Sequence, residues 1–86
     1  MLKPTLLIVD DEENITRSLA RSLRDQFTVF TANTGQVALD ILACESIDVI
    51  LTDQRMPGMP GVDLLARAKS VSPGSIGIAA SVSAMQ

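Results

Sequence analysis

Short apolar segments alternate with amphipathic segments along the 86-residue chain. Thr5–Val9 is an almost uninterrupted apolar run, which is typical of a strand buried on both faces of a parallel sheet. Residues 47–52 form a similar run, and each of these two runs is followed directly by an aspartate. Residues 27–31 alternate apolar and polar side chains, so we expect an edge strand there, and residues 75–80 are expected to form a fourth strand.

Three amphipathic segments separate the predicted strands. In the first, apolar residues recur every fourth position opposite a row of arginines, after acidic residues that favour a helix start. Asn33, Thr34 and Gly35 form a turn that is also suited to cap the second helix, and the third helix is expected over residues 62–69. The side chains predicted to face the sheet are Ile15, Leu19, Leu23, Val37, Ala38, Ile41, Leu42, Val62, Leu65 and Ala66.

The predicted elements follow the order strand, helix, strand, helix, strand, helix, strand. This alternation predicts an α/β fold with a parallel sheet, in which right-handed crossovers place the helices against the faces of the sheet. A chain of this length forms one small domain at most. The repeated Pro and Gly residues between Met56 and Gly61 predict a loop after the third strand.

Composition narrows the class of protein. Apolar residues make up 47% of the chain, so we expect an ordered core of aliphatic side chains rather than disorder. The net charge of −3 argues against direct binding to nucleic acid. The single cysteine, Cys44, follows Ile41 at helical spacing and is expected to fill the core, and it fits a reducing compartment. With no N-terminal signal and no apolar run of roughly 18 residues, we expect a cytoplasmic protein that does not bind a membrane.

Three aspartates mark the carboxyl ends of two predicted strands, Asp10 and Asp11 after the first and Asp53 after the third. Ligands of open parallel sheets bind at this edge, and the three carboxylates converge there if the two strands are neighbours. Converging carboxylates repel one another unless a cation lies between them, and a hard divalent ion such as Mg²⁺ suits oxygen ligands. Alternatively, the acids only favour a helix start and Asp53 only forms a turn. Two such positions in one chain, with a Met-Pro-Gly loop after the second, favour the metal-binding interpretation.

Two segments resemble the receiver domain of response regulators in two-component signalling. Residues 6–12 (Leu-Leu-Ile-Val-Asp-Asp-Glu) are similar to the opening of that family, and residues 47–59, which end in Arg-Met-Pro-Gly-Met, are similar to its phosphorylation strand and following loop. The resemblance covers about residues 2–81. It implies a flavodoxin-like open parallel sheet with strand order 2-1-3-4 and flanking helices. It also implies a signalling module rather than an enzyme, with a sensor histidine kinase or a histidine phosphotransfer domain as its partner.

The resemblance implies a role for each residue of the site. Asp53 is the phosphoacceptor, which attacks a phosphohistidine and becomes an aspartyl phosphate. Asp11, Asp53 and the backbone carbonyl of Arg55 hold Mg²⁺ directly, while Asp10 acts mostly through water. Ser81 contacts the phosphoryl group through a hydrogen bond. A carboxylate nucleophile, a metal ion and a hydroxyl donor are suitable components for phosphoryl transfer.

The sequence departs from the family pattern at two places. Pro60 stands where the family has an aspartate before a glycine, which removes a carboxylate that would cap the third helix. The larger departure is that no residues remain for the family's fourth helix, fifth strand and fifth helix, so residues 1–86 are expected to be a single incomplete receiver domain. The lysine of the family's fifth strand has no counterpart, because Lys69 is the last charged residue.

Two functions follow from these observations. We expect a phosphoacceptor receiver module of a two-component phosphorelay, and the alternative is a receiver-derived interaction or dimerisation module without effective phosphorylation switching. A neutral fourth strand at the edge favours a homo-oligomer, a dimer in which residues 75–86 complete the sheet of the partner copy. A phosphohydrolase of the haloacid dehalogenase type is disfavoured because Arg55 occupies the position of its second aspartate. A nucleotide-binding fold is disfavoured because no Gly-rich loop follows the first strand.

Overall fold

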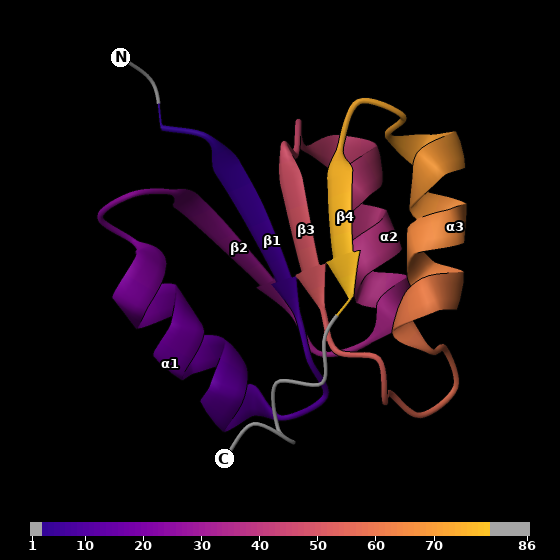
Figure 1. The fold of residues 1–86 in the computed structure, drawn as a ribbon, viewed down its shortest axis with the longest axis horizontal. Helices are drawn as coiled ribbons and strands as arrows, with labels where there is room; N and C mark the ends of the chain where they lie inside the picture. Colours follow the sequence, from indigo (N-terminus) through magenta and orange to yellow (C-terminus); the bar gives the residue numbers. More distant parts are fainter. Residues whose placement is uncertain (1–2, 80–86) are drawn as a thin grey trace.

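The computed structural model describes residues 3–79, which form an alternating series of strands and helices (Figure 1). In chain order the elements are β1 (Thr5–Val9), α1 (Glu13–Leu23), β2 (Thr28–Ala32), α2 (Gly35–Cys44), β3 (Val49–Thr52), α3 (Gly61–Val71) and β4 (Ile76–Ala79). The strands form one parallel sheet in the order β2-β1-β3-β4. The predicted α/β class, the four strands, the three helices and the strand order are therefore confirmed.

The helices cover the two faces of the sheet unequally. α1 packs against β1 and β2 on one face, while α2 and α3 lie side by side on the other face (Figure 1). The larger hydrophobic core lies under α2 and α3 and includes Leu7, Ile50 and Leu64. The smaller core lies under α1 and includes Ile8 and Ala20. Within residues 3–79, no helix has the length and apolar character needed to span a membrane.

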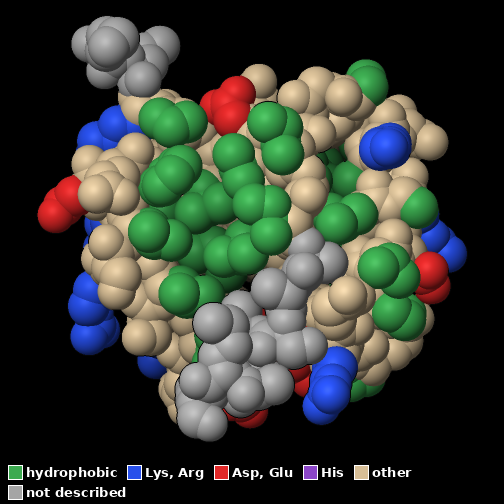
Figure 2. All heavy atoms as spheres, in the orientation of Figure 1, with side chains coloured by type: hydrophobic (Ala, Val, Ile, Leu, Met, Phe, Trp, Pro, Cys, Tyr) green, Lys and Arg blue, Asp and Glu red, His purple; other side chains and the backbone are tan. Residues whose placement is uncertain are grey.

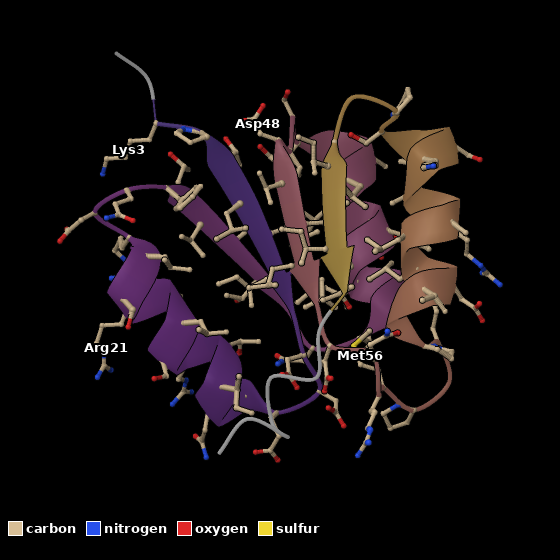
Figure 3. All side chains as sticks on the ribbon, viewed as in Figure 1. Lys3, Arg21, Asp48 and Met56 are labelled. Atoms are coloured by element: carbon tan, nitrogen blue, oxygen red, sulfur yellow. The ribbon has the colours of Figure 1, made fainter. Side chains whose placement is uncertain are left out.

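The apolar run of β1 is explained by its central position in the sheet. β1 pairs with β2 on one side and with β3 on the other, so that Leu7 lies between Phe30 and Ile50. Because helices cover both faces of the strand, residues 6–9 are all buried. At the amino end of the sheet, the Oδ2 atom of Asp48 accepts a hydrogen bond from the backbone N–H of Thr5 at 2.8 Å, which ties the start of β3 to β1 (Figure 3).

The buried stripe of α3 differs from the prediction. The structure buries Leu64 and Ala68, whereas Val62 and Ala66, which the periodicity predicts to face the sheet, are exposed. Leu65 is only partly buried. Two apolar stripes lie next to each other on this helix, and hydrophobic periodicity cannot choose between them. Packing of α3 against both the sheet and α2 selects the stripe that contains Leu64.

The predictions for α2 are wrong at two of its positions. Ala38 and Leu42 are buried as expected, but the side chain of Val37 is 44% exposed and Cys44 is also exposed. Val37 and Cys44 are seven residues apart, which places them on the same side of the helix. That side lies at the border of the buried face, so Cys44 does not fill the core.

The ends of the two later helices follow the sequence closely. The Oγ1 atom of Thr34 accepts a hydrogen bond from the backbone N–H of Val37 at 3.1 Å and caps α2, as the turn sequence predicts. α3 follows Pro60 and has no side-chain cap, which agrees with the loss of the family's aspartate there. In the loop before α3, Gly58 adopts a φ of 82°, a conformation that glycine accommodates without strain.

Gly61 allows the start of α3 to approach the end of β3. A Cβ atom at this position would lie 2.5 Å from the backbone carbonyl oxygen of Asp53, closer than two such atoms can pack. The N–H of Gly61 donates to the backbone carbonyl of Gln54 at 3.3 Å, so the backbone has little freedom to move away. Any larger residue here forces α3 and the segment after β3 apart.

Gly61→Ala is expected to lower the free energy of unfolding by about 1–3 kcal/mol, because the added methyl group overpacks the backbone at Asp53. Gly74→Ala is the matched control, since a Cβ atom at Gly74 meets nothing within 4 Å. We expect this control to change the free energy of unfolding by less than about 1 kcal/mol. Urea denaturation followed by circular dichroism measures both, and equal stability of the two variants would contradict the close approach.

Candidate acidic site

The carboxyl ends of β1 and β3 place two aspartates side by side. Val9 and Thr52 are partners in the pairing of these strands, so the next residues, Asp10 and Asp53, leave the sheet together at one edge. The backbone N–H of Asp53 donates to the carbonyl of Val9 at 2.9 Å, and that of Asp10 donates to the carbonyl of Ala32 at 3.1 Å. Strand pairing therefore holds both aspartates in place through their own backbones.

Asp11 completes an acidic group with the other two aspartates. One carboxylate oxygen from each of Asp10, Asp11 and Asp53 lies within 4.8 Å of the others. Asp10 and Asp53 are each only 2% exposed, whereas Asp11 is exposed. The group thus has two carboxylates in a buried floor and a third at an open rim, an arrangement that a ligand can reach from solvent.

The two oxygens of the Asp10 carboxylate have different surroundings. Oδ1 accepts a hydrogen bond from the backbone N–H of Glu12 at 3.0 Å. Oδ2 is buried, and no donor for it is found in the part of the chain that the structure describes. A buried carboxylate oxygen without a donor is unfavourable by the cost of its lost hydration. An unpartnered oxygen on a carboxylate that lies beside two further carboxylates fits the ligand of a cation.

The electrostatics of the group agree with this interpretation. Burial raises the pKa of Asp10 above its ordinary value, and the neighbouring carboxylate of Asp53 raises it further. The hydrogen bond from the N–H of Glu12 opposes these effects without cancelling them, and contact with Asp11 adds to the rise. In the absence of a cation, the folded structure therefore disfavours the ionised form of Asp10.

The structure brings together most of the residues that the sequence predicts for the site. Asp10, Asp11 and Asp53 converge as expected. The backbone N–H of Arg55 donates to Oδ1 of Asp53 at 3.3 Å, so the main chain of Arg55 borders the group while its side chain is exposed. Ser81 lies outside the described residues, as do residues 80–86 of the segment predicted to join two copies.

Asn33 is a supporting residue of the site that the sequence reading treats only as part of a turn. Its Nδ2 atom donates to the backbone carbonyl of Asp10 at 2.9 Å. Asn33 follows β2 directly, and β2 is the neighbour of β1, so the strand order places it beside the acidic group. The residue type and its position after a strand were visible in the sequence, but its contact depends on which strand lies next to β1.

The loop after β3 is anchored in the larger hydrophobic core next to the site. Met56 belongs to the larger hydrophobic core and is only 6% exposed, which anchors the loop that follows Asp53. Figure 3 shows Met56 near the carboxyl end of the sheet, opposite the end that carries Asp48. A buried loop residue of this kind limits the movement of the Asp53 backbone.

The fold is an open parallel α/β sheet, and its acidic residues lie beyond the carboxyl ends of the central strands. Proteins of this class bind their ligands at that edge of the sheet. Comparison with known proteins identifies the family within that class. The sequence model of the response regulator receiver domain family matches residues 6–85, and the chain belongs to this family.

The chain is similar to the hydrogenase transcriptional regulatory protein HoxA of Cupriavidus necator, with 39% identity over 69 residues that cover 80% of the chain and 14% of that protein. It is similar to the sporulation initiation phosphotransferase F of Bacillus subtilis, with 36% identity over 72 residues that cover 83% of the chain and 58% of that protein. A solved structure of a response regulator protein from Burkholderia pseudomallei, with a phosphorylated aspartic acid, calcium ion and citrate, matches with a TM-score of 0.82 and 26% identity. That match covers 90% of this chain and 46% of the other, so the chain spans only part of each of these proteins.

Asp10→Asn is expected to stabilise the metal-free chain at neutral pH by on the order of 1–3 kcal/mol, because it removes a buried charge beside Asp53 and keeps an oxygen for the N–H of Glu12. The pKa of Asp10 is raised in the folded state, so the unfavourable ionised form is lost as the pH falls through that raised value. The advantage of the variant should therefore be complete above the raised pKa and absent below the ordinary pKa of an aspartate.

Urea denaturation in the presence of a chelator, repeated from neutral to acidic pH, measures this difference in the free energy of unfolding. Asp25→Asn, at an exposed position between α1 and β2, is the control for loss of one negative charge. A destabilising effect of Asp10→Asn at neutral pH, or an advantage that persists unchanged at acidic pH, would contradict the electrostatic account of the site.

Proposed function

We propose that this receiver domain accepts a phosphoryl group on Asp53 in the presence of Mg²⁺, as a module of a two-component phosphorelay. The observation that carries the proposal is the group of three carboxylates, each with an oxygen within 4.8 Å of the others, together with the buried Oδ2 atom of Asp10, for which residues 3–79 provide no hydrogen-bond donor. Burial and mutual repulsion make this arrangement unfavourable for the carboxylates alone, whereas a shared cation makes it favourable.

Asp53 is the member of the group best placed to act as the nucleophile. It follows β3 directly and lies within residues 47–59, which resemble the phosphorylation strand and following loop of the family. Asp11 lies exposed at the rim, and the hydrogen bond that Oδ1 of Asp10 accepts from the N–H of Glu12 is shorter, at 3.0 Å, than the one that Oδ1 of Asp53 accepts from the N–H of Arg55, at 3.3 Å. The similar structure from Burkholderia pseudomallei contains a phosphorylated aspartic acid, which supports the same chemistry for Asp53.

In the proposed reaction, a carboxylate oxygen of Asp53 attacks the phosphorus atom of a phosphohistidine on the partner protein. The O–P bond forms as the P–N bond breaks, and the departing imidazole nitrogen takes a proton from solvent. The product is an aspartyl phosphate and a free histidine. We assign as the partner a sensor histidine kinase or a histidine phosphotransfer domain in the cytoplasm, and similarity of this chain to a sporulation phosphotransferase supports phosphoryl transfer as the reaction.

The donor set of the site fits Mg²⁺, because it consists only of oxygen atoms and carries excess negative charge. Asp11, Asp53 and the backbone carbonyl of Arg55 would hold the ion directly, and Asp10 would act through water. When bound, the ion offsets the charge of the carboxylates and of the phosphoryl group. We assign to Ser81 a hydrogen bond from its hydroxyl group to a phosphoryl oxygen.

One observation favours a second function. The side chains of Ile76 and Ile78 on β4 are 66% and 49% exposed, which suits an interaction or dimerisation module without effective phosphorylation switching. This apolar edge and the acidic site use different residues, so the two functions can be tested separately. Absence of a phosphate adduct together with an oligomer that forms equally well in Asp53→Ala would favour the second function.

Incubation of the chain with acetyl phosphate and Mg²⁺ is expected to add one phosphoryl group, detected by intact mass spectrometry. Asp53→Asn should abolish the adduct because an amide oxygen is a poor nucleophile for phosphorus. Asp25→Asn should leave it unchanged, since this exposed residue lies away from the strand ends. Persistence of the adduct in Asp53→Asn would show that another residue is the phosphoacceptor. Absence of any adduct in the unchanged chain would overturn the proposed function.

Mg²⁺ is expected to raise the melting temperature of the chain, because an ion that binds only the folded state adds about 1.4 kcal/mol at ten times its dissociation constant. Asp11→Asn should remove most of this increase while changing the metal-free stability little, since Asp11 is exposed. Asp63→Asn, at an exposed position in the first turn of α3, serves as the control for one lost acidic residue. Equal stabilisation of all three proteins by Mg²⁺ would show that the ion binds elsewhere.

A further inference from the structure

The loop between β3 and α3 lies against the start of α2, although the two segments are far apart along the chain. A Cβ atom at Gly35, the first residue of α2, would lie 2.5 Å from the Sδ atom, 3.0 Å from the Cβ atom and 3.2 Å from the Cε atom of Met59. The side chain of Met59 therefore fills the space that a side chain at position 35 would need. Gly35 is buried, and Met59 is partly buried.

Gly35 is required for its small size rather than for its backbone conformation. Among the glycines of residues 3–79, a positive φ occurs at Gly58 and not at Gly35, so alanine could adopt the backbone conformation found at position 35. Alanine is also the better helix former. The closeness of Met59 is therefore the feature of the structure that explains a glycine at the start of α2.

The loop that carries Met59 is restrained at several points. Met56 is buried in the larger core near the beginning of the loop, and Gly61 lies against the backbone carbonyl of Asp53 at its end. Between these points, Gly58 adopts its φ of 82° and Met59 packs against the same core. A proline precedes Gly58 and another follows Met59, and each proline fixes its own φ. A contact at Met59 is therefore transmitted along the backbone of the loop.

The turn that Met59 contacts is itself tied to the acidic site. Asn33, two residues before Gly35, donates from its Nδ2 atom to the backbone carbonyl of Asp10 at 2.9 Å. Thr34 caps α2 with its side chain, which fixes the turn to the helix that follows. The turn thus has a defined position relative to Asp10, and Met59 joins the loop after β3 to this turn.

The main chain of Arg55 needs such a restraint from the rest of the loop. Its N–H donates to the Oδ1 atom of Asp53 at 3.3 Å, which is longer than the usual range for a hydrogen bond of this kind. Its side chain is exposed and does not anchor it. The position of the Arg55 backbone therefore depends on how the residues after it are held, and Met56 and Met59 hold them against the core.

We propose that Met59, seated against Gly35, is a positioning residue that fixes the main chain of Arg55 at the acidic site. The inference rests on the proposed function, in which the backbone carbonyl of Arg55 is a ligand of Mg²⁺. Met59 supplies no ligand atom, because a thioether sulfur does not suit this hard ion. It acts through the loop backbone, and a ligand that is already in place loses less conformational freedom when the ion binds.

Amide hydrogen exchange of the metal-free chain, followed by NMR, tests the restraint without any ion. Met59→Ala should accelerate exchange at the N–H of Arg55 by about tenfold or more, because the loop opens more often. Leu39→Ala is the matched control, since Leu39 lies on α2 and packs against the same core but not in the loop. It should change this exchange by less than about twofold. Met59→Leu keeps the volume of the side chain and should also retain slow exchange. Circular dichroism verifies that each variant keeps its fold.

Isothermal titration calorimetry with Mg²⁺ tests the consequence for the site. Met59→Ala should raise the dissociation constant of Mg²⁺ about tenfold, whereas Leu39→Ala should leave it unchanged although it also removes an apolar side chain from the core. Gly35→Ala should act in the same direction as Met59→Ala, because the added methyl group displaces Met59. The double variant should bind Mg²⁺ no more weakly than Met59→Ala alone, since the contact is already lost.

Equal acceleration of exchange in Met59→Ala and Leu39→Ala would show that Met59 has only a general structural role and would overturn the proposal. Additive effects of Gly35→Ala and Met59→Ala on Mg²⁺ binding would overturn the contact between the two residues as the cause. If the unchanged chain does not bind Mg²⁺ at all, the proposed function fails, whereas hydrogen exchange still decides whether Met59 fixes the main chain of Arg55. The two proposals can therefore fail independently.

Discussion

Repulsion between carboxylates that neighbouring parallel strands hold together is the constraint on which the site depends. Asp10 and Asp53 follow paired positions on β1 and β3, and their backbones bond to adjacent strands, so the sheet holds the two backbones next to each other. Burial makes this proximity more unfavourable, because it raises the pKa of Asp10 and so disfavours the ionised form of its carboxyl group. The convergence of these carboxylates is the observation on which the proposed binding of a cation rests.

The surrounding loops maintain this arrangement. Asn33 bonds to the backbone of Asp10, and Met56 anchors the segment after β3 in the larger core. Gly61 allows α3 to start directly against the carbonyl of Asp53. Each of these residues follows a different strand, or begins the helix that comes next. The carboxyl edge of the sheet therefore brings together residues from two separate parts of the chain, the turn after β2 and the segment between β3 and α3, and their contacts support the two buried aspartates.

The strand order has a second consequence at the edge of the sheet. α1 covers β1 and β2, so on the same face Val49 and Leu51 of β3 are only partly buried, and Ile76 and Ile78 of β4 are exposed. Figure 2 shows hydrophobic side chains gathered over the strands that α1 leaves uncovered. The acidic site and the exposed apolar side chains of β4 are thus two products of one topology. The acidic site lies at the ends of the strands and consists of charged groups, while the side chains of Ile76 and Ile78 lie along a strand and are apolar.

The sequence by itself determined the strands, the helices, the acidic residues and the family, because apolar runs and their periodicity report burial directly and the motif residues lie close together along the chain. It did not determine which of two adjacent apolar stripes α3 buries. The periodicity predicted that Val62 is buried, whereas the structure exposes Val62 and buries Leu64. The sequence also predicted that Cys44 fills the core, although it is exposed, and it indicated only a turn at Asn33, although this side chain bonds to Asp10. The sequence around these positions does not show which distant residues lie next to them. Those facts depend on how helices pack together and which strands are adjacent, and only the tertiary structure decides such contacts between distant residues.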